Sequence, residues 1–163
     1  ALFCGKTLAQ AVHALWDVSN AFESAPQADE SEALLKPIRV LLAEDDTEMR
    51  RLLVSTLLRE HCEVIEARNG SQLWERLEQV VTHQQQALDL IISDVRMPGR
   101  SGLDVLRVLR RTDRQTPVIL ITAFGDPETH AEAYQLGALA VFNKPFDLDD
   151  LRTLVTSLQK VDV

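Results

Sequence analysis

From residue 37 onward, short apolar runs alternate with longer segments in which apolar residues recur every three or four positions. The short runs predict β-strands over residues 38–43, 63–67, 88–93, 117–122 and 139–143. The longer segments predict helices over residues 47–60, 70–85, 102–112, 127–136 and 147–160. Alternation of this kind is typical of a parallel sheet with right-handed crossovers and helices on both faces. We therefore expect an α/β fold with a doubly wound, five-stranded parallel sheet.

The strands differ in pattern. Residues 38–43, 88–93 and 117–122 are almost continuously apolar, which predicts central strands buried on both faces. Residues 63–67, EVIEA, alternate between polar and apolar, as an edge strand can.

The first 36 residues form a separate part of the pattern. Four apolar residues fall on one face of a helix, and they are Leu8, Val12, Leu15 and Phe22. A polar, acidic stretch follows, ESAPQADESEA, which is typical of a linker. We predict an N-terminal amphipathic helix and linker over residues 1–36, and a globular domain over residues 37–163. Either the helix packs on that domain or it docks with a partner or a second copy.

Composition narrows the functional classes. The chain has 163 residues, 45% of them hydrophobic, and a formal net charge of −8 with no basic run, so we expect no direct binding of nucleic acid. No apolar run is long enough to span a membrane, and no signal peptide is indicated. Cys4 and Cys62 form no metal-binding or disulfide pattern, which fits a cytoplasmic protein.

Polar residues stand where four of the predicted strands end. Glu44 and Asp45 follow the first strand, Asp94 ends the third, Thr122 ends the fourth and Lys144 follows the fifth. In a parallel sheet the carboxyl ends of the strands lie along one edge, where such sheets hold their sites. We therefore expect these five side chains to lie close together.

Each position alone has an ordinary structural explanation, such as an N-cap at Asp46, a turn at Asp94 or a solvated charge at Lys144. Together, the carboxylates need a compensating cation, because two like charges about 4 Å apart repel by about 4 kcal/mol at an effective dielectric of about 20. Mg²⁺ relieves such repulsion, and it commonly retains a position for a phosphoryl oxygen. The set therefore fits transfer of a phosphoryl group to a carboxylate.

Four motifs extend this interpretation: VLLAEDD, LIISDVRMPGRSGLDVL, VILITA and FNKPF. In order and spacing they resemble the landmarks of the receiver domain of two-component response regulators, over about three quarters of the chain. The resemblance implies a flavodoxin-like fold with strand order 2-1-3-4-5. It also implies a phosphoacceptor signalling domain that is not an enzyme toward other substrates and catalyses only its own phosphorylation and dephosphorylation.

The resemblance assigns roles to the residues at the strand ends. Asp94 would accept a phosphoryl group from a sensor histidine kinase or a histidine phosphotransfer protein, while Thr122 and Lys144 would contact that group. The Lys144–Pro145 peptide bond would be cis.

The same resemblance implies a Mg²⁺ site. Asp45 and Asp94 would bind the ion directly, Glu44 would bind it through water, and the main-chain carbonyl of Arg96 would complete the protein ligands.

The chain departs from the family pattern in its fifth predicted strand. The family usually has Tyr or Phe three residues before the lysine, where this chain has Val141, with Phe142 next to it.

Several alternative functions remain open. A degenerate receiver that acts only as an interaction module, or the receiver part of a larger transcriptional regulator, fits the sequence as well. An aspartyl phosphatase is disfavoured, because Arg96 stands where a second Asp is needed. A flavodoxin is disfavoured, because EDDTEM would repel a phosphate.

Overall fold

The computed structural model describes residues 36–82 and 87–159. Five parallel strands form one sheet in the order β2-β1-β3-β4-β5, which confirms the predicted flavodoxin-like topology. The strands are β1 Ile38–Ala43, β2 Cys62–Ala67, β3 Leu90–Asp94, β4 Val118–Thr122 and β5 Ala140–Asn143. The helices are α2 Thr47–Arg59, α3 Gly70–Thr82, α4 Gly102–Leu109, α5 Pro127–Gln135 and α6 Leu148–Ser157.

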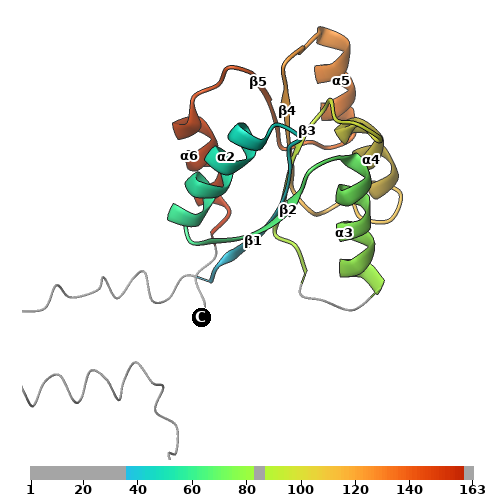
Figure 1. Cartoon of the computed structure of the whole chain (residues 1–163). Helices are drawn as coiled ribbons and strands as arrows, with labels where there is room; N and C mark the ends of the chain where they lie inside the picture. The colour runs from blue at the N-terminus through green and yellow to red at the C-terminus, as the bar shows by residue number, and fades with distance from the viewer. Residues whose placement is uncertain (1–35, 83–86, 160–163) are drawn as a thin grey trace, which may run out of the picture. The chain divides into compact units, whose positions relative to one another are not determined.

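Two layers of helices cover the sheet. Helices α2 and α6 lie on one face, and α3, α4 and α5 lie on the other (Figure 1). Successive residues of a strand point to opposite faces, so Leu41 belongs to the core beneath α3 and α4 whereas Leu42 belongs to the core beneath α2 and α6. The two cores fix the sheet from both sides.

The burial of the strands follows their sequence patterns. Every residue of β3 and β4 is buried, as is all of β1 except Arg39. Among the described strands, β2 pairs only with β1, and two of its residues, Glu63 and Glu66, are exposed. The prediction of central and edge strands is therefore confirmed.

The element ends differ from the predictions by a few residues. Strand β3 begins at Leu90, and the preceding Asp89 contacts β1: its N–H donates to the Arg39 carbonyl, and its carboxylate accepts the Arg39 N–H. Helix α4 ends at Leu109, because Asp113 accepts the N–H groups of Gln115 and Thr116 and closes a turn.

The predicted N-terminal helix and linker lie outside the described residues, except for Lys36, so that prediction stays untested. Among the helices that the structure describes, none combines the length and apolar character needed to cross a membrane.

Candidate functional site

The carboxyl ends of the strands are held together by hydrogen bonds that continue past the strands themselves. The N–H of Glu44 donates to the Ala67 carbonyl (3.1 Å), and the N–H of Lys144 donates to the Thr122 carbonyl (2.8 Å). The N–H of Val95 donates to the Ile121 carbonyl (2.8 Å). These bonds fix the backbone at the positions from which the predicted site residues project.

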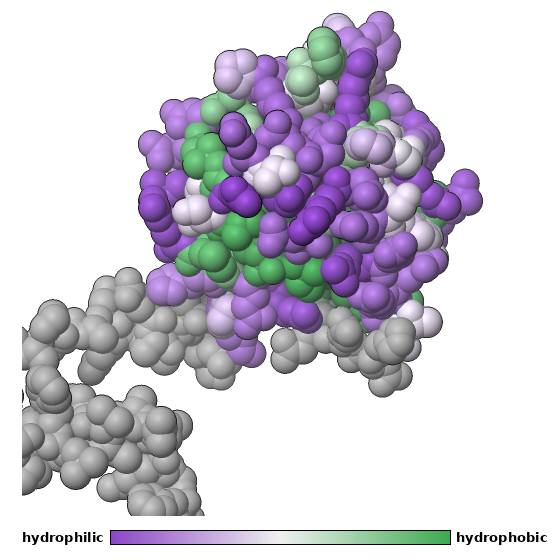
Figure 2. Space-filling model, viewed as in Figure 1, coloured by the Kyte–Doolittle hydropathy of each residue, from purple (hydrophilic) through white to green (hydrophobic). Residues whose placement is uncertain are grey.

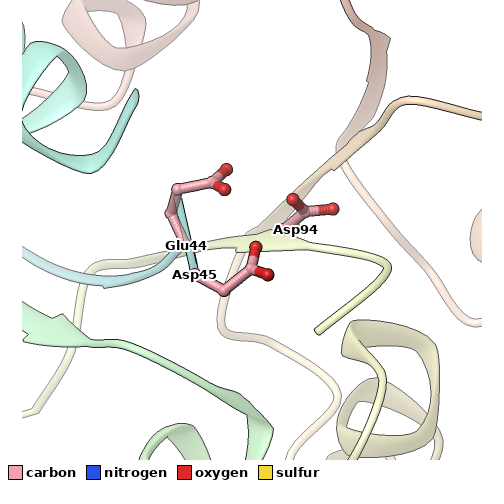
Figure 3. Close-up of side chains that lie close together, drawn as sticks. All are labelled: Glu44, Asp45 and Asp94. Atoms are coloured by element: carbon pink, nitrogen blue, oxygen red, sulfur yellow. The ribbon is translucent and has the colours of Figure 1, made fainter. Parts of the chain in front are cut away.

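Three carboxylates meet at this edge. One oxygen from each of Glu44, Asp45 and Asp94 lies within 4.8 Å of the others. Figure 3 shows that the three carboxylates converge on one space, with Glu44 and Asp45 following β1 and Asp94 ending β3. Glu44 and Asp94 are buried, whereas Asp45 is exposed. The site is therefore open to solvent on the side of Asp45.

Lys144 bridges the two buried carboxylates. Its Nζ lies 2.9 Å from Asp94 Oδ2 and 3.1 Å from Glu44 Oε2. Burial lowers the pKa of the Lys144 ammonium, but the hydrogen bonds to Asp94 and Glu44 outweigh burial and leave the pKa above its ordinary value. Lys144 is therefore a fixed positive charge beside the Asp94 carboxylate.

Glu44 is a buried carboxyl close to the second buried carboxyl, that of Asp94. Burial and then the charge of Asp94 raise the pKa of the Glu44 carboxyl to about 7, even though Lys144 and the Asp46 N–H both donate to it. A cation placed among the three carboxylates would favour the charged form of Glu44.

Thr122 and Asp94 are both oriented by main-chain N–H groups two residues further along the chain. The hydroxyl oxygen of Thr122 accepts the Phe124 N–H (3.1 Å), and Asp94 Oδ1 accepts the Arg96 N–H (3.1 Å). The Arg96 guanidinium lies 4.6 Å from the centre of the Phe124 ring, so the loops after β3 and β4 contact each other above the site.

Arg50 is a site-supporting residue that the sequence analysis missed. Its side chain is buried, and its Nη1 donates to the main-chain carbonyl of Glu44 (2.9 Å), while its Nε lies 3.3 Å from Glu66. A signal existed, since Arg50 shares the helical spacing of the buried Leu53 and Leu57. A charged residue on the buried face of a helix needs a polar partner, and here that partner is the main-chain carbonyl of Glu44.

Glycines allow the chain to turn sharply after Asp94. Gly99 has φ of 85°, which an L side chain rarely adopts. At Gly102, the first residue of α4, a Cβ would lie 2.4 Å from the Asp94 carbonyl oxygen. The start of α4 therefore packs directly against the backbone of Asp94, which explains why a rigid turn follows this aspartate.

The structure brings together five of the predicted site residues: Glu44, Asp45, Asp94, Thr122 and Lys144, all at the carboxyl ends of the strands. The Arg96 main chain also adjoins Asp94 through its N–H, whereas its carbonyl as a metal ligand stays a prediction. The Lys144–Pro145 peptide bond is cis, as expected. Val141 packs in the core beneath α3, α4 and α5, and Phe142 packs on the opposite side with Phe146.

The donor set fits a magnesium ion. Three carboxylates offer hard oxygen ligands, one oxygen of each lying within 4.8 Å of the others. Asp45 and Asp94 are the side chains that would hold the ion.

Comparison with known proteins identifies the family. The family model described as the response regulator receiver domain matches residues 40–156. The chain therefore belongs to this family, whose general function is transfer of a phosphoryl group to an aspartate.

Two relatives illustrate the range of the family. The response regulator protein PilR of Pseudomonas aeruginosa is 35% identical over 119 residues, which cover 73% of this chain and 25% of PilR. Sporulation initiation phosphotransferase F of Bacillus subtilis is 32% identical over 117 residues, which cover 72% of this chain and 90% of that protein. The chain thus spans about a quarter of one relative and nearly all of the other.

Solved structures agree with the fold. The chemotaxis response regulator CheY4 of Vibrio cholerae superposes with a TM-score of 0.64 at 26% identity, covering 76% of this chain and 99% of CheY4. The response regulator TrrA of Thermotoga maritima, solved in complex with Mg(2+)-BeF, superposes with a TM-score of 0.63 at 29% identity, covering 74% of this chain and 98% of TrrA.

Proposed function

We propose that Asp94 is the phosphoacceptor of this chain and that it receives its phosphoryl group from a sensor histidine kinase or a histidine phosphotransfer protein. The observation that carries the proposal is the setting of the Asp94 carboxylate. It is 5% exposed, ends a central strand, lies 2.9 Å from Lys144 and shares a space with two further carboxylates.

In the proposed reaction, an oxygen of Asp94 forms a bond to phosphorus as the bond between phosphorus and the donor imidazole nitrogen breaks. The imidazole keeps the electron pair, and the product is an acyl phosphate. Lys144, already bound to Asp94 Oδ2, is placed to contact the phosphoryl oxygens, and the Thr122 hydroxyl is placed to donate to them once it releases the Phe124 N–H.

A Mg²⁺ ion belongs to this proposal. Asp45 and Asp94 would hold it directly, Glu44 through water, and the Arg96 carbonyl would complete the protein ligands. Such an ion neutralises the charge that develops on the phosphoryl oxygens.

The proposed role is that of a signalling domain that acts on no other substrate. We place it in the cytoplasm, and the free thiol of Cys62 supports a reducing compartment. A receiver that serves only as an interaction module would make no use of the Lys144–Asp94 pair.

Intact mass after incubation with acetyl phosphate and Mg²⁺ tests the proposal. The wild-type chain and the control Asp150→Asn, which changes an exposed aspartate on α6, should each gain one phosphoryl group, while Asp94→Asn should gain none. A wild-type chain that stays unmodified would favour the interaction module. Modification of Asp94→Asn at the wild-type rate would assign the acceptor elsewhere.

A further inference from the structure

A groove of about 770 Å³ lies between α2 and the edge strand β2, apart from the three carboxylates of the site. Its lining carries four arginines and one glutamate: Arg50, Arg51, Arg59, Arg68 and Glu66. The groove is therefore strongly positive in a chain whose formal net charge is −8.

Most of this positive charge is uncompensated. Arg50 is buried and pairs with Glu66. Within the part of the chain that the structure describes, the guanidinium groups of Arg51, Arg59 and Arg68 make no ion pair or hydrogen bond, and all three residues are exposed. Three free guanidinium groups on one groove form a ready-made site for carboxylates, which they can bind through paired N–H groups.

The groove also offers an apolar contact. Leu58 is 58% exposed, and Val54, one turn before it on α2, is half-buried. Both side chains line the same groove as the arginines. Figure 2 has the same view as Figure 1, with β2 toward the viewer, and on this face strongly hydrophilic side chains border a hydrophobic strip. A partner can therefore bury an apolar side chain while its carboxylates pair with the arginines.

We propose that this groove docks an acidic segment of a partner protein, one that combines several carboxylates with an apolar side chain. Charge complementarity carries the choice of partner, because an acidic segment is repelled by most of this chain and attracted to the groove. A nucleic acid is a poorer match, since its long phosphate backbone meets the same repulsion and has no use for Leu58. This inference goes beyond the proposed phosphoryl transfer and does not depend on it.

The test uses a fluorescein-labelled peptide of about twelve residues, rich in Glu with two Leu, and measures binding by fluorescence anisotropy. The wild-type chain should bind it saturably. The double variant R51E/R68E should weaken binding by about tenfold or more, because both substitutions turn attraction into repulsion. Its matched control is R111E/R114E, which makes the same change in net charge at exposed arginines outside the groove lining, and should weaken binding by less than about twofold.

Two further measurements separate the partner classes. L58Q, which leaves the charge unchanged, should weaken binding of the peptide by about threefold or more, and a single-stranded DNA oligonucleotide should bind far more weakly than the peptide. The circular dichroism spectrum and melting temperature of R51E/R68E should match those of the wild type, which shows that the variant is folded. No saturable binding, equal losses in both double variants, or DNA binding as tight as the peptide with no effect of L58Q would each overturn the proposal.

Discussion

Lys144 is the cation that contacts both buried carboxylates of the acidic site, those of Asp94 and Glu44. Replacing it with Met leaves two buried carboxylates without their cation. We expect Lys144→Met to lower the free energy of unfolding of the metal-free protein by about 1–3 kcal/mol at pH 7, as for lost hydrogen bonds to charged groups. Urea unfolding measures this change.

The control for this variant is Arg107→Met. Arg107 also bridges two carboxylates, those of Asp104 and Glu132, but at the surface. Exposed ion pairs contribute about 0–1 kcal/mol, so the control should lose less. Equal losses in the two variants would contradict the view that burial makes the Lys144 contacts strong.

At the scale of single residues, the sequence predicted Glu44, Asp45, Asp94, Thr122 and Lys144, because parallel strands bring their carboxyl ends to one edge. It did not reveal Arg50, whose partner is a main-chain carbonyl. Every residue has such a carbonyl, so no sequence pattern marks the one that Arg50 contacts. The contact between Arg96 and Phe124 was missed for a related reason, since it depends on how two loops fold over the site.

At the scale of elements, the junction of α4 with β3 is held by Gly102. Alanine favours a helix over glycine by about 1 kcal/mol, but here its Cβ would overlap the Asp94 carbonyl and the Ser93 hydroxyl. We expect Gly102→Ala to destabilise the fold by about 1–3 kcal/mol and to slow phosphorylation, because α4 must shift away from Asp94. Glu75→Ala, at an exposed position of α3, should change stability by about 0.5 kcal/mol or less. A Gly102→Ala variant that is more stable than the wild type would contradict this expectation, because it would show that the junction accommodates a Cβ.

Strand β5 carries a second prediction at this scale. Val141 and Phe142 point to opposite faces, and Phe142 packs with Phe146 at a ring-centre distance of 5.3 Å. No large ring therefore stands ready at position 141 to fill the space that Thr122 leaves when it turns toward a phosphoryl group. We expect beryllofluoride with Mg²⁺ to shift the NMR signals of Thr122 and Lys144 strongly, and those of α5 and β5 less than in Val141→Tyr. A ring of Phe142 that moves to the opposite face on binding would contradict this expectation.

The elements themselves were largely predictable because hydrophobic periodicity fixes their type. The residues at which the elements end were harder to predict, because hydrogen bonds of individual side chains determine them. Asp46 caps α2 at the predicted place by accepting the Met49 N–H, whereas Asp113 closes a turn that ends α4 early. Asp residues suit both a helix start and a turn, so the sequence alone does not separate these outcomes.

At the scale of the whole molecule, the acidic site should couple metal binding to stability. A ligand that binds only the folded state stabilises it by about 2.7 kcal/mol at a hundredfold excess over Kd. We expect Mg²⁺ to raise the melting temperature of the wild-type chain accordingly. Asp45→Asn should raise the melting temperature without metal, because it removes one of three converging negative charges, and should abolish the response to Mg²⁺. An unchanged response to Mg²⁺ in this variant would contradict the proposed ligand set.

The overall topology followed from the order of strands and helices together with the family resemblance, and the structure confirms it. The division into residues 1–36 and 37–163 stays a prediction. The groove between α2 and β2 could not be foreseen, because three of its arginines lie on a helix and the fourth, Arg68, follows the end of an edge strand. The packing of α2 against β2 brings Arg68 to the arginines of the helix.

Locating the phosphoryl group within the chain tests the proposed function most directly. Borohydride reduces an aspartyl phosphate to homoserine, so peptide mass spectrometry after treatment with acetyl phosphate, Mg²⁺ and borohydride identifies the modified residue. We expect homoserine at position 94 and unmodified aspartate at positions 45 and 46. Homoserine at another position, with Asp94 intact in the phosphorylated protein, would contradict the assignment of Asp94 as the phosphoacceptor.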